Sequence, residues 1–155
     1  MEIKIRPARE KDKKFVVSLV PRLTEFELPV WRESKQMNFV DEKVLTGVLS
    51  ANFSETLIFI AEDENAAPLG FIHFRVSSDY YDSEKHGHIS DIVVAPEGEG
   101  RGVGKALMNF AEEWAKGSGF KWLTLNVFSR NDRARKLYEK LGYGEDTIKY
   151  LKELK

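Results

Sequence analysis

The sequence contains no cysteine, only three histidines, and no apolar run of the ~18 residues that a transmembrane helix needs. The absence of cysteine excludes disulfide bonds, thiol catalysis and zinc–thiolate sites. The three histidines are too few and too poorly spaced to form a convincing metal motif. The N-terminal residues also lack the apolar stretch of a signal peptide. We therefore expect a cytoplasmic protein with no metal ion.

The chain also lacks an excess of charge of either sign, because its 24 basic and 25 acidic side chains leave a net charge of −1. Neither nucleic acid nor a membrane surface is expected as the main partner of such a chain. A length of 155 residues with 42% hydrophobic content predicts one domain, residues 1–155, with a substantial core. Asn52-Phe53-Ser54 matches a glycosylation sequon, which we expect to be coincidental in a cytoplasmic chain.

Hydrophobic periodicity predicts an order of strands and helices along the chain. Strands are expected at residues 3–5, 57–61, 69–76, 89–94, 122–127 and 148–151. Helices are expected at residues 15–23, 44–49, 103–117 and 134–141. The resulting order, β-α-α-β-β-β-α-β-α-β, contains no internal repeat or linker. It predicts an α/β protein of the α+β type, with one mixed sheet and helices on its faces.

The most informative stretch lies between the expected strand at 89–94 and the helix that follows it. Four alternating glycines occur there, in Gly98-Glu99-Gly100-Arg101-Gly102-Val103-Gly104-Lys105. Alternating glycines allow a tight turn and bring main-chain N–H groups close to a ligand. The start of a helix adds free N–H donors and the positive end of the helix dipole. The stretch therefore predicts a site for a phosphate-bearing ligand.

Two familiar phosphate motifs do not fit this loop. A P-loop would need a glycine at Glu99 and a serine or threonine at Ala106. The dinucleotide fingerprint fails because the position of its last glycine falls on Val103, Lys105 or Leu107. The loop instead resembles the pyrophosphate loop of the GNAT acyltransferase superfamily, which reads Gln or Arg, two variable residues, Gly, one variable residue, and Gly or Ala. Residues 99–104 fit every position but the first, where Glu99 stands.

Other segments extend this resemblance to nearly the whole chain. "HISDIVVAP" resembles the family's fourth strand, and "IKIRPAREKD" resembles its opening strand and helix start. "NDRARKLYEKLGY" resembles a third family pattern, carried here by Asn131, Ala134, Leu137, Tyr138, Gly142 and Tyr143. The resemblance implies the GNAT fold and an N-acetyltransferase that uses acetyl-CoA, the family's usual donor. It also makes a homodimer possible.

The resemblance implies which residues bind the cofactor. The loop would hold the diphosphate of coenzyme A through Gly100, Arg101, Gly102, Val103, Gly104 and Lys105. The strand segment Ile92, Val93 and Val94 would pair with the pantetheine arm, and one of its N–H groups would polarise the thioester carbonyl. Asn131 would bond the pantetheine arm, with helix capping as the alternative. Glu99 would repel a phosphate at close range unless its side chain points away.

Two residues are candidates for catalysis. Tyr138 is a candidate acid, because a phenol with a pKa of ~10 can protonate or stabilise a thiolate whose conjugate acid has a pKa of ~8.5. Asp91 is a candidate base or water relay for an ammonium substrate with a pKa of ~10.4. Core packing for Tyr138 and a surface position for Asp91 are the alternatives. His88 and Glu84 are weaker candidates for the base.

The acceptor is expected between the loop after the first helix and the loop at residues 77–87. These loops carry acidic and aromatic groups that suit a cationic, partly apolar amine, namely Glu25, Phe26, Glu27, Trp31, Tyr80, Tyr81 and Asp82. Ordinary packing and solvated charge are the alternatives. The sequence thus predicts direct acetyl transfer to a primary amine of a small molecule or peptide in a ternary complex. A non-catalytic sensor or interaction module that binds acyl-CoA is the rival hypothesis.

Overall fold

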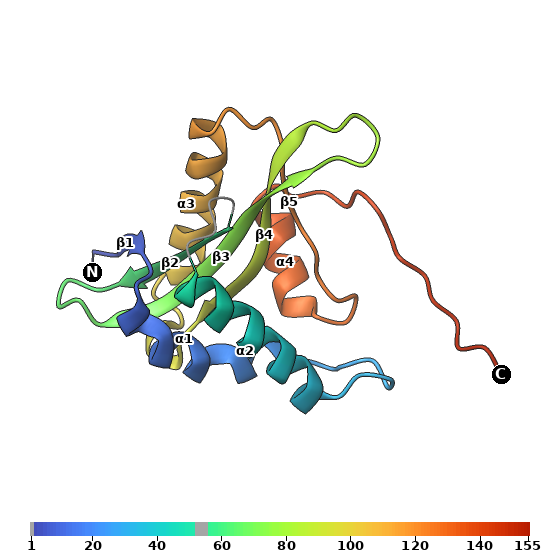
Figure 1. Cartoon of the computed structure of the whole chain (residues 1–155), viewed down its shortest axis with the longest axis horizontal. Coiled ribbons are helices and arrows are strands. Elements are labelled where there is room, and N and C mark those ends of the chain that lie inside the picture. The colour runs from blue at the N-terminus through green and yellow to red at the C-terminus, as the bar shows by residue number, and fades with distance from the viewer. Residues whose placement is uncertain (1, 52–55) are drawn as a thin grey trace.

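The computed structural model describes residues 2–51 and 56–155, so the sequon at 52–54 lies outside the described residues. A mixed sheet runs through the molecule (Figure 1). The strands are antiparallel from the first to the fourth, and the fifth is parallel to the fourth. Their order in the sheet is β1 (Lys4–Pro7), β2 (Thr56–Glu62), β3 (Pro68–Ser78), β4 (Lys85–Val94) and β5 (Leu123–Leu125). The predicted α/β class with a mixed sheet is confirmed.

Helices cover both faces of the sheet (Figure 1). Side chains of α1 (Lys13–Leu19), the 3-10 helix η2 (Val20–Thr24) and α2 (Ser34–Ser50) pack on one face. Those of α3 (Val103–Gly117) and α4 (Asp132–Lys140) pack on the other. Short 3-10 turns, η1 (Glu10–Asp12) and η3 (Pro96–Gly98), precede α1 and α3. None of the helices in the described ranges is long and apolar enough to span a bilayer.

β3 contributes side chains to the hydrophobic cores on both faces of the sheet, because successive strand residues point to opposite faces. Phe71 is fully buried against α1 and α2, and Ile72 is fully buried against α3. The register with β4 then shifts, since His73 lies opposite Asp91 but Phe74 lies opposite Ile89. Such a shift is a β-bulge, which re-aims side chains at one point of a strand. It sets His73 and Asp91 on the face that α1 and α2 cover.

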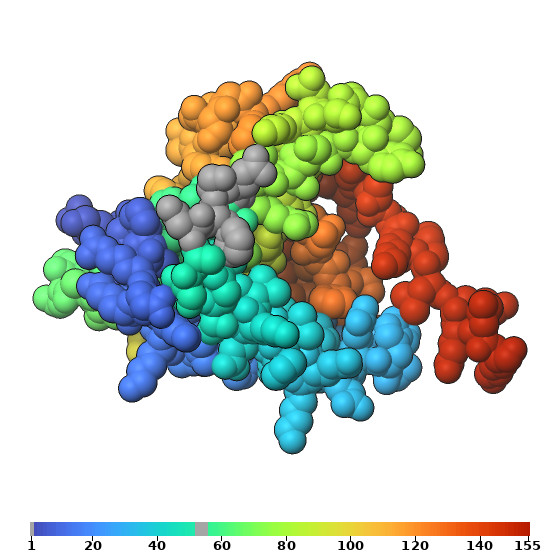
Figure 2. Space-filling view, in the orientation of Figure 1, coloured from blue at the N-terminus to red at the C-terminus, as the bar shows by residue number. Residues whose placement is uncertain are grey.

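The predicted final strand at residues 148–151 is wrong. After α4 the chain carries no strand, and its last residues stand away from the rest of the molecule (Figures 1 and 2). Ile148 is 62% exposed and Tyr150 is 88% exposed. Two alternating apolar residues satisfy the pattern of a strand, but a strand also needs main-chain hydrogen bonds to a neighbour. β5 is only three residues long, and the described chain pairs nothing with its outer edge.

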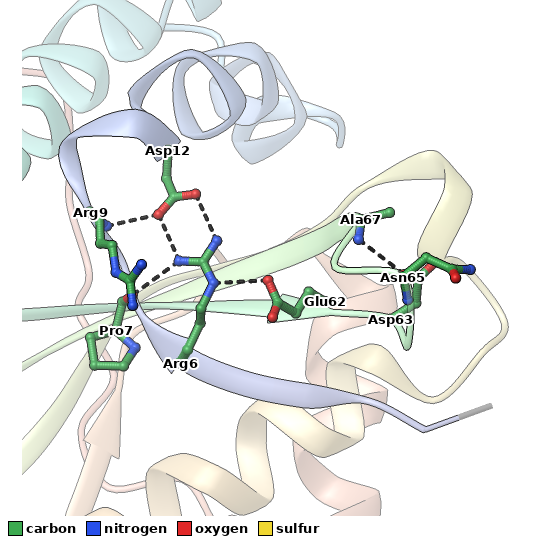
Figure 3. Close-up of polar contacts among 8 residues, drawn as sticks. All are labelled: Arg6, Pro7, Arg9, Asp12, Glu62, Asp63, Asn65 and Ala67. Atoms are coloured by element: carbon green, nitrogen blue, oxygen red, sulfur yellow. Dashed lines mark hydrogen bonds and ion pairs between the residues drawn. The ribbon is translucent and has the colours of Figure 1, made fainter.

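A buried ion cluster fastens β1 to the segment before α1 (Figure 3). The guanidinium of Arg6 donates to both oxygens of Asp12, at 2.8 and 2.9 Å, and its Nε donates to Glu62 at 2.8 Å. Asp12 also accepts the main-chain N–H of Arg9 at 2.8 Å. These hydrogen bonds, led by that from Arg6, hold the pKa of Asp12 below its usual value. The cluster therefore stabilises the fold only while Asp12 is ionised.

We expect Asp12→Asn to lower the free energy of unfolding by about 2–4 kcal/mol at pH 7, because it leaves a largely buried arginine with one carboxylate fewer. The folded-state pKa of Asp12 is depressed. The contribution of Asp12 to stability is therefore present above its unfolded pKa of ~3.9, and it is lost as pH falls from there through the folded-state pKa. The gap between wild type and variant should therefore close towards pH 3. Urea unfolding at several pH values measures this, with Asp146→Asn in the exposed tail as the control. A gap that does not change with pH would contradict it.

Candidate active site

The glycine loop at residues 98–105 keeps one side of its backbone open. Gly100 and Gly102 have φ of +71° and +80°, in the left-handed region that favours glycine. A Cβ at either position would meet no heavy atom of the described residues within 4 Å. α3 begins directly after Gly102, so its first N–H groups face this open space. The local geometry is that of an anion site at a helix start.

The basic residues of the loop remain near the loop itself or in solvent, whereas its acidic residue Glu99 contacts another part of the chain. Arg101 donates to the carbonyl of Glu97 at 3.0 Å, and Lys105 is exposed in the first turn of α3. The carboxylate of Glu99 forms an ion pair with Arg22 of η2. Glu99 is thus not simply solvated, and its charge is balanced by an arginine from a distant part of the sequence.

Within the described residues, the edge of β4 beside this loop has no neighbouring strand to pair with its main-chain groups. β5 pairs with β4 only over Gly87–Ile89, which leaves the later residues of β4 without a strand on that side in the described chain. The main-chain N–H of Ala95 donates to the carbonyl of Leu69 in β3 at 2.8 Å. Because main-chain groups alternate in direction along a strand, those of Val94 and Ile92 point away from β3. An extended ligand arm can therefore pair with Ile92 and Val94 at this edge.

Tyr138 of α4 packs in the same core cluster as Ile92 and Val94. Its ring makes a T-shaped contact with Tyr143, with centroids 6.2 Å apart. Burial raises the pKa of Tyr138, so its phenol stays protonated at neutral pH. Among the described residues, its hydroxyl has no hydrogen-bond partner, unlike that of Tyr143, which donates to Glu112 at 3.1 Å. The predicted acid thus lies on the side of β4 where the predicted cofactor strand exposes Ile92 and Val94.

Asn131 is the N-cap of α4. Its Oδ1 accepts the main-chain N–H of Ala134 at 3.3 Å, which is one of the two roles that its sequence position predicted. The cap fixes the start of the helix that carries Tyr138 seven residues later. The structure therefore gives Asn131 a positioning role through its oxygen, and contact with a cofactor stays a prediction.

Asp91 is hydrogen-bonded to a histidine that sequence reasoning did not select. His73 Nδ1 lies 3.0 Å from Asp91 Oδ2, across the β-bulge between β3 and β4. An ionised carboxylate only accepts hydrogen bonds, so the Nδ1–H of His73 donates to Asp91. His73 is only 3% exposed, and its Nε2 has no partner among the described residues. The hydrogen bond fixes the orientation of the Asp91 carboxylate.

A cavity of about 610 Å³ opens beside this pair, between α2 and strands β2 to β4. Its polar lining consists of Asp41, Lys43, Thr56, His73, Arg75, His88, Ser90 and Asp91. Burial, followed by the charge of Asp91, raises the pKa of Asp41. Burial, followed by the charge of Arg75, lowers the pKa of His88, whose Nδ1 contacts Thr124 Oγ1 at 2.8 Å. The cavity thus combines carboxylates with a His88 ring that is neutral at pH 7.

The aromatic residues predicted for the acceptor lie elsewhere. Tyr80 and Tyr81 are 90% and 92% exposed at the tip of the β3–β4 hairpin, and Trp31 is 56% exposed. Phe26 packs on Phe128 with ring centroids 5.4 Å apart. Glu25 lies 3.6 Å from Arg22. None of these side chains lines the cavity beside Asp91, so their contact with the acceptor stays a prediction.

One signal in the sequence pointed to the missed histidine. His73 is the only ionisable residue in the apolar run 69–74, and it shares the strand face of Phe71. A buried polar residue in such a run needs a partner, and a hairpin with the next strand supplies Asp91. Asp41 gave no comparable signal, because its helix presents many charged residues.

Comparison with known proteins agrees with this geometry. The family model described as "Acetyltransferase (GNAT) family" matches residues 20–143, which is most of the chain. The chain belongs to the GNAT family. The resemblance found in the sequence, and the fold that it implied, are therefore confirmed.

Relatives of this GNAT chain carry related names. It is 31% identical over 143 residues to YhfO, an uncharacterized N-acetyltransferase of Bacillus subtilis, covering 92% of this chain and 91% of that protein. A putative acetyl transferase from Pyrococcus furiosus is 29% identical, with a TM-score of 0.75 over 99% of this chain and all of that one. The structure of AAC(6')-Iy with a bisubstrate analog, CoA-S-monomethyl-acetylneamine, is 22% identical, with a TM-score of 0.70 over 99% and 100% of the two chains. At that identity the last likeness supports the fold alone.

Proposed function

We propose that this protein is an acetyl-CoA-dependent N-acetyltransferase that acetylates a primary amine of a small molecule or peptide. The observation that carries the proposal is the open glycine loop at the start of α3, next to the unpaired edge of β4. The loop suits the diphosphate of coenzyme A, and the main chain of Ile92 and Val94 suits the pantetheine arm. A main-chain N–H at this edge would polarise the thioester carbonyl.

The acceptor amine would occupy the cavity beside Asp91. There the ammonium group loses a proton to Asp91, directly or through a water, while His73 holds the carboxylate in place. The free amine attacks the thioester carbonyl carbon and forms the new C–N bond. The C–S bond then breaks, and Tyr138 gives its proton to the departing thiolate. The amide nitrogen then loses its second proton, which restores the proton of Tyr138, and Asp91 releases the proton that it accepted to solvent.

The lining of the cavity indicates which amines should be tested as a panel of acceptors. Asp41 and Asp91 line the cavity together with Lys43 and Arg75, and a carboxylate among them can accept the hydrogen bonds of a substrate ammonium group. Polyamines, aminoglycoside-like sugars, amino acids, peptide N-termini and lysine side chains all carry such a group. The AAC(6')-Iy complex is named for an acetylneamine conjugate, so neamine-type sugars belong in the panel. A homodimer and a single-domain organisation over residues 1–155 stay predictions, which sedimentation velocity and limited proteolysis test.

Thiol release tests the function directly, because the protein has no cysteine and contributes no thiol background. We expect acetyl-CoA and at least one amine of the panel to release free coenzyme A. Gly102→Ala should weaken coenzyme A binding by about 10-fold, because its methyl group would stand on the open side of the loop. Gly104→Ala is the control, because the family's pattern allows alanine there, the new Cβ would meet Val94 only at 3.7 Å, and alanine favours helices over glycine.

Two outcomes would contradict the proposal. Wild-type protein whose melting temperature does not respond to coenzyme A, at concentrations far above those of typical cofactor binding, would exclude the cofactor site. Stabilisation by coenzyme A without thiol release from any amine would instead support the sensor hypothesis.

A further inference from the structure

Arg22 connects η2 to two parts of the expected cofactor site. Its Nε donates to the carbonyl of Val94 at 2.9 Å, and its Nη2 forms the ion pair with Glu99. Its Nη1 lies 3.6 Å from Glu25 Oε2. η2, which carries Arg22, is thereby joined to the end of β4 and to the glycine loop.

These contacts lie where the cofactor would bind. The carbonyl of Val94 is one of the main-chain groups that point away from β3, at the edge expected to pair with the pantetheine arm. Glu99 immediately precedes Gly100, the first residue of the open loop. The side chain of Arg22 is only 22% exposed, so its guanidinium is held at this junction rather than extended into solvent.

The chemistry of the two anions decides which one Arg22 prefers. Glu99 is 40% exposed, and an ion pair at such a surface position adds little stability and is easily exchanged. A diphosphate carries more charge and accepts bidentate, charge-assisted hydrogen bonds from a guanidinium. The carboxylate of Glu99 would also repel a diphosphate held on the neighbouring N–H groups unless a cation balances it.

We propose that Arg22 is a cofactor-binding residue, and that it exchanges the carboxylate of Glu99 for the diphosphate of coenzyme A when the cofactor binds. Glu99 is then an internal competitor that holds Arg22 in place in the free protein and lowers the affinity for coenzyme A. This inference rests on the proposed function, because it requires the diphosphate to bind at the glycine loop.

The deciding experiment is calorimetric titration of coenzyme A into a set of charge-matched variants. Arg22→Gln/Glu99→Gln keeps the net charge of the wild type, and we expect it to bind coenzyme A about 5- to 10-fold more weakly, because the bonds from the guanidinium to phosphate are lost. Glu99→Gln alone should bind about 3- to 5-fold more tightly, because Arg22 is released from its competitor. Glu97→Gln removes the same charge two residues away and serves as the control, with a smaller gain.

Pantetheine, which lacks the diphosphate, provides the second arm. Its binding should be unchanged in Glu99→Gln and should not weaken in the double variant, because losing Arg22 only frees the carbonyl of Val94, and melting temperatures without ligand should show that all are folded. A double variant that binds coenzyme A as tightly as wild type would overturn the proposal, because Arg22 would then only neutralise Glu99. Equal gains from Glu99→Gln and Glu97→Gln would overturn it as well. If folded wild-type protein binds no coenzyme A, the proposed function fails instead.

Discussion

Replacing Asp91 with asparagine should lower kcat/KM for the amine by about 100- to 1,000-fold, the usual contribution of a general base. Asparagine keeps the shape of the side chain, and its carbonyl oxygen still accepts the hydrogen bond from His73 Nδ1. What it loses is the ability to take a proton from the ammonium group. Steady-state thiol release across pH 6–9 measures the effect, and coenzyme A affinity should change little because Asp91 lies on the face of β4 opposite Ile92.

The matched control is His88→Gln, which alters another titratable group of the same cavity. The lowered pKa of His88 keeps its ring neutral above pH ~6.5, so it is a competent alternative base. We expect the loss in His88→Gln to stay within about 3-fold. If Asp91→Asn retained nearly full activity while His88→Gln lost about 100-fold, the base would be His88 and Asp91 would only orient the substrate.

The sequence predicts the frame of this site because the frame depends on local patterns. Alternating glycines, a strand before them and a helix after them can each be recognised within a few residues, and the structure places Gly100, Gly102 and the start of α3 as those patterns require. The cap at Asn131 is equally local. Elements of this kind carry their own signal, so the fold class and the local geometry of the glycine loop could be predicted.

For contacts between distant segments, no local pattern in the sequence shows which two residues will meet. His73 meets Asp91 only because of a bulge between β3 and β4, and periodicity cannot show where a register shifts. Arg22 and Glu99 are 77 residues apart in the sequence, so nothing local predicts their pairing. The strand expected at 148–151 was wrong for the opposite reason, because its local pattern was present but the structure supplies no neighbouring strand to pair with it.

Replacing Tyr138 with phenylalanine should lower kcat by about 100-fold while leaving the affinity for coenzyme A nearly unchanged. The aromatic ring that packs against the core cluster is retained, and only the hydroxyl that protonates the thiolate is lost. Burial raises the pKa of Tyr138 above 10.0, so wild-type activity should not decline below pH 10 through loss of this proton. Single-turnover rates at saturating acetyl-CoA and amine isolate the chemical step from product release.

Tyr143→Phe is the control that separates acid catalysis from simple loss of a hydroxyl. Its ring lies 6.2 Å from that of Tyr138, but its hydroxyl is bonded to Glu112 and has no role in the proposed reaction. This variant should keep kcat within about 3-fold of wild type and lose about 1 kcal/mol of stability with its hydrogen bond. Equal rates in Tyr138→Phe and wild type would show that the thiolate leaves without an acid. In that case its low basicity, with a conjugate-acid pKa of ~8.5, would be sufficient for departure at neutral pH.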